Sequence, residues 1–167
     1  RTVLVADTNV EDFPSSERLV AISKSCVRVS KLFGFDPKVA FLSHSTFGKP
    51  ISRNTKHVRD AIEMLKNEKV EFDFDGEMQP DVALNPIYQD VYPFSKIVGR
   101  ANILIMPALH SAAISTKLMK SFGGAKLIGP LLIGLDLPIE VAPLRSSTSD
   151  ILNLASIAAY SADVINY

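Results

Sequence analysis

Short apolar runs alternate along this chain with longer segments of helical periodicity. The runs at residues 2–7, 38–45 and 101–107 are almost continuously apolar, as in strands that are covered on both faces. Between them, residues 15–34 and 55–68 carry apolar side chains three and four positions apart, which is the spacing of one helix face. Strands that alternate with helices predict an α/β fold, with a layered, mostly parallel sheet and helices on both of its faces.

Further elements are expected from the same patterns. They are a strand at 69–76, a helical stretch at 81–84, a helix at 111–124, short strands or extended loops at 125–134 and 139–144, and a closing helix at 147–167. Ser15 or Ser16 can cap the first long helix, and Gly34 can end it. In such a sheet, ligands gather where the carboxyl ends of the strands meet the helix starts.

The composition limits what such a fold can bind. Lys+Arg and Asp+Glu both total 18, so the formal net charge is zero and no basic field is available for nucleic acid. The longest apolar runs fall well short of the roughly 20 residues of a membrane-spanning helix, so no membrane partner is expected. The single cysteine, Cys26, excludes an internal disulfide and fits a reducing compartment. We therefore expect a cytoplasmic protein in which Cys26 is a core residue.

Five carboxylates crowd the end of the strand expected at 69–76. They are Glu71, Asp73, Asp75, Glu77 and Asp81. A metal site, a pair of catalytic acids and a solvated or hydrogen-bonded turn would all look like this. The spacing does not match a calcium-binding loop, and no Cys or His joins the cluster, so the pattern favours the turn over a metal.

Other polar side chains follow the expected strands. His44 and His110 come directly after strong strands, where functional loops lie in this architecture, whereas His57 falls on a polar helix face and is expected to be exposed. The start of the closing helix, at Ser147 or Thr148, offers free backbone N–H groups to an anion. An ordinary capped helix, with Asp150 in its first turn, explains that segment equally well.

Four blocks of the sequence resemble the phosphate acetyl/butyryltransferase family in order and spacing. They are "FDGEMQPDVALNP", "PFSKIVGRANILIMPAL", "STKLMKSFGGAKLIGPLLIGLDLPIEVAPL" and "SDILNLASIAAY". Within the family, the chain looks most like the C-terminal domain of hybrid NADP-dependent malic enzymes. The resemblance implies the phosphotransacetylase fold, which is similar to that of isocitrate and isopropylmalate dehydrogenases. It also implies that Asp75 and Glu77 are structural or cleft-lining groups rather than metal ligands.

The resemblance covers nearly the whole chain but only about the second half of a free-standing transferase. Residues 1–140 would form the main α/β lobe, and residues 141–167 would add a cleft segment and the C-terminal helix of a second lobe. Most of that second lobe would precede residue 1. Arg1 stands where an initiator Met is missing and leads straight into a strand-like run, so we expect a longer parent protein.

One block departs from the family where the transferase chemistry is expected. Active members read Ser-Arg-Gly at its start, with an Asp seven residues after the Ser. Counting back from Asp150 places Pro143 at the Ser position and Leu144 at the Arg position. Proline has no hydroxyl, and leucine cannot hold an acyl phosphate with a forked donor. Ala113 also replaces a common Asn, and Arg145 lies one position beyond the Arg site, so we expect no catalytic residue here.

The resemblance therefore implies a regulatory domain that senses acetyl-CoA. The parent enzyme would decarboxylate malate to pyruvate with NADP and a divalent metal (Mg or Mn), both held by an upstream malic enzyme domain of the same chain. This part would carry no cofactor or metal, and it would self-associate as a dimer or larger homo-oligomer. The alternatives are an active phosphate acetyltransferase, which moves acetyl between coenzyme A and phosphate, and a scaffold that only holds an oligomer together.

The expected ligand cleft has two walls. One wall would consist of Arg145, Ser146, Ser147 and Asp150, and the other of His110, Ser111 and Lys117. We expect both segments to follow strong strands and to open a helix, where the free N–H groups and the helix dipole favour the phosphates of a coenzyme.

Overall fold

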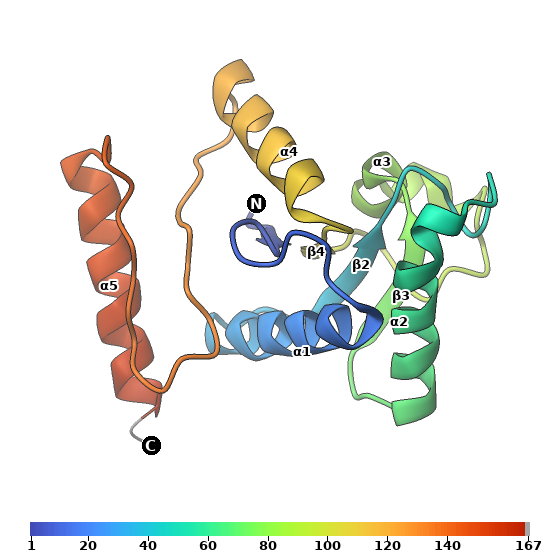
Figure 1. The fold of residues 1–167 in the computed structure, drawn as a ribbon, viewed down its shortest axis with the longest axis horizontal. Coiled ribbons are helices and arrows are strands. Elements are labelled where there is room, and N and C mark those ends of the chain that lie inside the picture. Colours follow the sequence, from blue (N-terminus) through green and yellow to red (C-terminus); the bar gives the residue numbers. More distant parts are fainter. Residues whose placement is uncertain (166–167) are drawn as a thin grey trace. The chain divides into compact units, whose positions relative to one another are not determined.

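The computed structural model describes residues 1–165, and a parallel sheet is the core of residues 1–113 (Figure 1). Its strands are β1 (Leu4–Ala6), β2 (Lys38–Leu42), β3 (Asp73–Met78) and β4 (Ile103–Ile105), in the spatial order β1-β4-β2-β3. Every pairing is parallel, so the predicted α/β class and the parallel sheet are confirmed. The third strand begins four residues later than the sequence pattern indicated, because residues 69–72 form the approach to it.

Both faces of the sheet are buried, which explains why the strands read as continuous apolar runs. Alternate residues of β2 belong to different cores: Val39 and Phe41 face one cluster, and Ala40 and Leu42 face the other. The first cluster lies under α1 (Ser16–Leu32) and α2 (Lys56–Glu68). The second lies under α3 (Pro80–Leu84) and the first turn of α4 (Leu109–Phe122). Short 3₁₀ turns at Arg53–Thr55 (η1) and Pro86–Gln89 (η2) complete the connections.

The ends of α1 follow the predicted signals. The Ser15 hydroxyl accepts a hydrogen bond from the Arg18 amide at 3.3 Å, which satisfies one of the free N–H groups of the first turn. At the other end Gly34 has φ of 75°, and the amide of Phe35 donates to the carbonyl of Ser30 at 3.0 Å. This bond is the signature of a glycine-terminated helix, so both predicted ends are confirmed.

The chain divides into two compact units, residues 1–113 and 114–167. The first contains the sheet, and the second contains most of α4 and the helix α5 (Thr148–Ile165). Between α4 and α5 the chain is extended, with one isolated bridge between Leu131 and Glu140, so residues 125–134 and 139–144 form loops rather than regular strands. The predicted helix at 147–167 is confirmed through residue 165, and its last two positions lie outside the described residues. The lobe boundary expected after residue 140 stays a prediction.

Cys26 lies in the first core, where it is 2% exposed. Burial raises the pKa of its thiol to about 12, with the carboxylate of Asp7 as a smaller cause. The predicted core role of this residue is therefore confirmed. Over residues 1–165, each helix is too short or too polar to span a bilayer.

Candidate functional site

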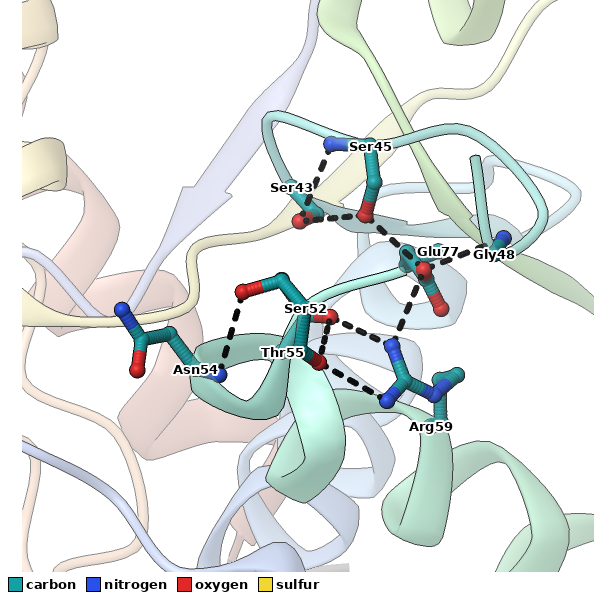
Figure 2. Close-up of polar contacts among 8 residues, drawn as sticks. All are labelled: Ser43, Ser45, Gly48, Ser52, Asn54, Thr55, Arg59 and Glu77. Atoms are coloured by element: carbon teal, nitrogen blue, oxygen red, sulfur yellow. Dashed lines mark hydrogen bonds and ion pairs between the residues drawn. The ribbon is translucent and has the colours of Figure 1, made fainter. Parts of the chain in front are cut away.

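A buried carboxylate organises the loops at the carboxyl ends of β2 and β3. The side chain of Glu77 is 1% exposed and accepts three hydrogen bonds at Oε1, as Figure 2 shows. The donors are the Ser45 hydroxyl at 2.8 Å, the Gly48 amide at 3.1 Å and the Arg59 guanidinium at 3.3 Å. A buried charge is tolerated only when it is paired and hydrogen-bonded, and Glu77 meets both conditions.

Arg59 joins this carboxylate to the start of α2. Its Nη2 donates to the carbonyl of Ser52 at 2.9 Å, and its Nη1 donates to the hydroxyl of Thr55 (Figure 2). The Thr55 hydroxyl in turn donates to the Ser52 carbonyl at 3.1 Å. The guanidinium therefore ties the loop after β2, the first turn of α2 and the end of β3 into one network.

Asp75, two residues before Glu77, is also a hydrogen-bonded carboxylate. It is 7% exposed, and its carboxylate accepts from the Lys96 amide at 2.7 Å and from the Gly76 amide at 2.9 Å. Across residues 1–165, no three His, Cys, Asp or Glu side chains gather closely enough to hold a metal ion. Of the alternatives that the acidic cluster left open, the geometry favours the hydrogen-bonded turn.

Gly76 separates the two buried carboxylates for a steric reason. Its φ is 144°, and a Cβ at this position would lie 2.7 Å from the carbonyl oxygen of Phe41 on the neighbouring strand. Only glycine permits this backbone conformation and this close approach of β3 to β2. The glycine of the Asp-Gly-Glu block is thus a packing requirement of the sheet.

The three histidines differ in their surroundings. His44 is exposed, and its carbonyl accepts from the Gln79 side chain at 2.8 Å. His110 is exposed and packs against the ring of Phe13, with 5.5 Å between the ring centroids. The expectation that His57 is exposed was wrong: it is half-buried, and its Nε2 lies 3.0 Å from the carbonyl oxygen of Pro107. His57 lies on a face of α2 that the sequence pattern indicated to be polar, and its side chain contacts the chain just after β4.

The start of α5 is closed by a reciprocal cap. The Asp150 carboxylate accepts from the Ser147 amide at 2.9 Å and from the Ser147 hydroxyl at 2.8 Å. In return, the Ser147 hydroxyl accepts from the Asp150 amide at 3.2 Å. These bonds from Ser147 lower the pKa of Asp150, with the charges of Lys120 and Lys126 as smaller causes. Ser147 is thus the cap that the sequence left open between two residues.

The residues before this cap form a turn at the surface. The amide and the hydroxyl of Ser146 both donate to the carbonyl of Pro143, at 2.9 Å and 2.7 Å. Leu144 and Arg145 occupy the corner of the turn, and the side chains of both are exposed. Over the part of the chain that the structure describes, no hydrogen bond or salt bridge holds the Arg145 guanidinium.

The expected second wall is divided between the two units. His110 and Ser111 belong to the first unit, where the Ser111 hydroxyl donates to the carbonyl of Ala108 at 2.7 Å. Lys117 belongs to the second unit, together with the Arg145–Asp150 segment. The structure brings Ser147 and Asp150 into contact, while the joining of the two walls into one cleft stays a prediction.

Sequence reasoning missed Arg59 and Ser45 as partners of Glu77. They lie 18 and 32 positions away along the chain, so no local pattern connects them. The sequence carried only an indirect signal: a carboxylate at the end of a strand needs a cation and several donors if it is buried, but the pattern names no partner.

The fold matches that of solved phosphotransacetylases. The phosphotransacetylase of Streptococcus pyogenes matches with a TM-score of 0.88 at 34% identity, over 96% of this chain and 49% of that one. EutD phosphotransacetylase of Staphylococcus aureus matches with a TM-score of 0.84 at 32% identity, over 95% and 49%. The predicted fold is therefore confirmed.

The chain belongs to the phosphate acetyl/butaryl transferase family, whose sequence pattern matches residues 1–159. It is 49% identical to an NADP-dependent malic enzyme of Rhizobium meliloti (strain 1021) over 162 residues, which is 97% of this chain and 21% of that protein. It is 34% identical to the phosphate acetyltransferase of Bacillus subtilis (strain 168), over 92% of this chain and 48% of that protein. The chain thus spans about a fifth of such malic enzymes and about half of such transferases.

Proposed function

We propose that this chain is the acetyl-CoA-sensing regulatory domain of an NADP-dependent malic enzyme, and that it has lost transferase activity. The identity to the Rhizobium meliloti malic enzyme exceeds that to the Bacillus subtilis transferase, which supports the malic enzyme branch. The parent protein would decarboxylate malate to pyruvate in an upstream domain. That domain, and not this chain, would hold the NADP and the Mg or Mn ion.

One observation supports the proposed loss of transferase activity: the turn at residues 143–146 lacks the groups that acyl transfer needs. Pro143 offers only a carbonyl, and that carbonyl already accepts two bonds from Ser146. Leu144 is fully exposed and cannot neutralise a phosphate. Asp150 remains, but its Oδ2 is occupied by Ser147 in the helix cap. The Ser147 hydroxyl does contact the Asp150 carboxylate, at 2.8 Å, but this pair is engaged in the helix cap, where the same hydroxyl also accepts from the Asp150 amide.

The same turn supports a sensing role. Arg145 projects from its corner with an unoccupied guanidinium, directly before the N-terminus of the 18-residue helix α5. A phosphate group of the effector would meet an exposed guanidinium and the positive end of a helix dipole in one short segment. That His110, Ser111 and Lys117 form the opposite wall of the cleft stays a prediction from the sequence.

Calorimetric titration of the intact protein with acetyl-CoA tests the proposal. A charge-assisted hydrogen bond to phosphate contributes about 1.5–3 kcal/mol, so Arg145→Ala should weaken acetyl-CoA binding roughly ten- to a hundredfold. The acetyl-CoA concentration that changes malate turnover should rise by a similar factor, because binding and regulation are linked. Arg28→Ala, which removes an exposed arginine of α1, is the matched control and should respond like the wild type.

An active phosphate acetyltransferase is the second candidate function, supported by the retained Asp150 and by the fold. It predicts formation of acetyl phosphate from acetyl-CoA and phosphate by the intact protein. Turnover that is abolished by Asp150→Asn would establish that activity and overturn the regulatory proposal. If neither turnover nor acetyl-CoA binding occurs, the scaffold alternative is the better description.

Self-association is a further part of the proposal. The second unit exposes many large apolar side chains, among them Phe122 at 84%, Leu137 at 68% and Leu152 at 66%. Exposed apolar surface on this scale is typical of an interaction surface. We expect light scattering on the intact protein to report a dimer or larger homo-oligomer, and a monomer at micromolar concentration would refute this part.

A further inference from the structure

A cavity of ≈ 460 Å³ opens at the carboxyl ends of β2 and β3 in the first unit. Its walls come from the loop after β2, the start of α3, the η2 turn and the segment at 91–94. The volume falls within the roughly 300–1,000 Å³ range of sites that hold small molecules. The location is where ligands bind in open parallel sheets.

Three aromatic rings form the apolar wall of this cavity. The ring centroids of Phe47 and Phe94 are 4.9 Å apart, those of Phe47 and Tyr92 are 5.4 Å apart, and those of Tyr92 and Phe94 are 6.1 Å apart. The planes of the first and third pairs are steeply inclined, at 68° and 81°. Steeply inclined rings present both faces and edges, so this wall suits a flat, apolar or π-bonded group. Phe94 is 64% exposed and lies open to such a group.

Phe47 is held in place by the buried network of Glu77. Its φ is 49°, in the left-handed region that a bulky residue rarely adopts. The Phe47 amide donates to the Glu77 carbonyl at 2.7 Å, and the next amide, of Gly48, donates to the Glu77 carboxylate at 3.1 Å. Thr46 and Lys49 close the loop with two mutual backbone bonds, at 3.0 and 3.1 Å. A strained residue that its surroundings fix so fully is a common feature of binding sites, where it positions a side chain in advance.

The polar rim of the cavity contains a carboxylate, an amide and an ammonium group, from Asp81, Gln79 and Lys49. The Asp81 carboxylate bonds the hydroxyl of Tyr88 and raises its pKa. The Gln79 amide nitrogen is bound to the carbonyl of His44. Lys49 is exposed, and no hydrogen bond or salt bridge within residues 1–165 holds its ammonium group. Lys49 is therefore the cation on the loop side of the cavity, two residues from the ring of Phe47, while the Asp81 carboxylate lies on the α3 side with the Tyr88 hydroxyl.

We propose that this cavity is a second binding site, for a small molecule in which a flat ring carries an anionic group. The ring packs against Phe47, Tyr92 and Phe94, and the anionic group pairs with Lys49. Nucleoside monophosphates and aromatic carboxylates share this chemistry. The site uses none of the residues of the proposed acetyl-CoA cleft, so it stands independently of the regulatory function.

Ligand-observed NMR titration of the intact protein tests the site, with AMP, benzoate, adenosine and inorganic phosphate as probes. AMP or benzoate should bind. The tighter binder shows whether the natural ligand is a nucleoside monophosphate or an aromatic carboxylate. Inorganic phosphate alone should bind at least tenfold more weakly than the better of the two, because it lacks a ring. If neither AMP nor benzoate binds at millimolar concentration, the proposal is overturned.

Three variants and two controls locate the binding. Phe94→Ala, at a largely exposed position where folding is not at risk, and Phe47→Ala should each weaken binding of the better probe roughly tenfold. Lys49→Gln should weaken binding of the anionic probe by a similar factor, while binding of adenosine should stay unchanged. Phe13→Ala, at a ring that is 77% exposed, and Lys31→Gln, at an exposed lysine of α1, should bind like the wild type. Equal binding by Phe94→Ala and Lys49→Gln and by the wild type would show that the probes bind elsewhere.

Discussion

The guanidinium of Arg59 lies 3.3 Å from the carboxylate of Glu77, a side chain that is only 1% exposed. Removing the cation would leave a buried charge with only neutral donors. Breaking a buried pair in this way costs roughly 3–5 kcal/mol, and since Arg59 is 32% exposed, water can enter and the lower end applies. We expect Arg59→Ala to lower the free energy of unfolding by about 3 kcal/mol in urea denaturation.

A surface pair gives the matched control for that measurement. Lys24 and Glu68 form a salt bridge with about 40% of each side chain exposed. Exposed pairs contribute about 0–1 kcal/mol, so Lys24→Ala should change stability little. Equal losses for Arg59→Ala and Lys24→Ala would contradict the structural role given to Glu77.

Gly76→Ala should be among the most damaging single substitutions in the first unit. The new Cβ would lie 2.7 Å from the Phe41 carbonyl, and the residue would keep a φ that alanine rarely adopts. Backbone strain and overpacking together cost about 3 kcal/mol or more. Gly34→Ala is the control, because its φ of 75° is also positive but open space surrounds it, and about 1–2 kcal/mol is expected. Thermal unfolding of the two variants measures the difference.

Cys26 should be inert to thiol reagents in the native protein. Its pKa is raised to about 12, so the reactive thiolate is scarce at any pH at which the protein is handled. We expect modification by iodoacetamide at pH 8 to follow global unfolding and to become fast only in urea. Above pH 9, the value from which the pKa is raised, the unfolded chain ionises first, so this thiol makes stability fall as pH rises toward 12. Rapid labelling without denaturant would refute the core placement.

The cap of α5 should respond to acid. The pKa of Asp150 is lowered from 3.8 in the folded protein, so the carboxylate stabilises the folded state above that pH. This contribution is lost as pH falls through the lowered pKa. At pH 7, Ser147→Ala should destabilise the helix by about 1 kcal/mol through loss of the cap. Amide hydrogen exchange in residues 148–152 should rise in Ser147→Ala and remain normal in the control Ser156→Ala.

Partial repair of the transferase block should not restore activity. Pro143→Ser with Leu144→Arg returns two family residues, but Ala113 remains and Arg145 still replaces a glycine. Catalytic groups that act as a unit are strongly non-additive, so we expect almost no acetyl phosphate formation from the double variant. A large gain would show that the rest of the site is intact.

The fold could be predicted from sequence wherever the signal is local. The cap at Ser15 and the helix end at Gly34 depend on residues within one turn of each other: Gly34 was identified, and the cap was narrowed to Ser15 or Ser16. The strand pairing Val39–Ile103 was not predictable, because many registers would bury the same apolar runs. Segment 139–144 was ambiguous between strand and loop, since an apolar extended run forms a strand only where a partner lies beside it.

The candidate sites show the same limit. The acidic cluster was visible in the sequence, but the donors that neutralise Glu77 come from separate loops. Likewise, the exposure of His57 depends on where the end of β4 lies, and the helix pattern contains no information about it. The family resemblance supplied the Asp150 position, whereas the cap formed with Ser147 was one of two alternatives until its geometry was known.

The position of β4 between β1 and β2 has a consequence for the newly made chain. The ribosome releases β1 and β2 well before β4, and neither can acquire its central neighbour until Ile103–Ile105 emerges. At about 5–20 residues per second, the delay after β2 is roughly 3–12 s. During that interval both strands present unpaired apolar edges, which are the features that recruit other chains. We therefore expect the nascent first unit to be most prone to association with other chains until its last strand inserts.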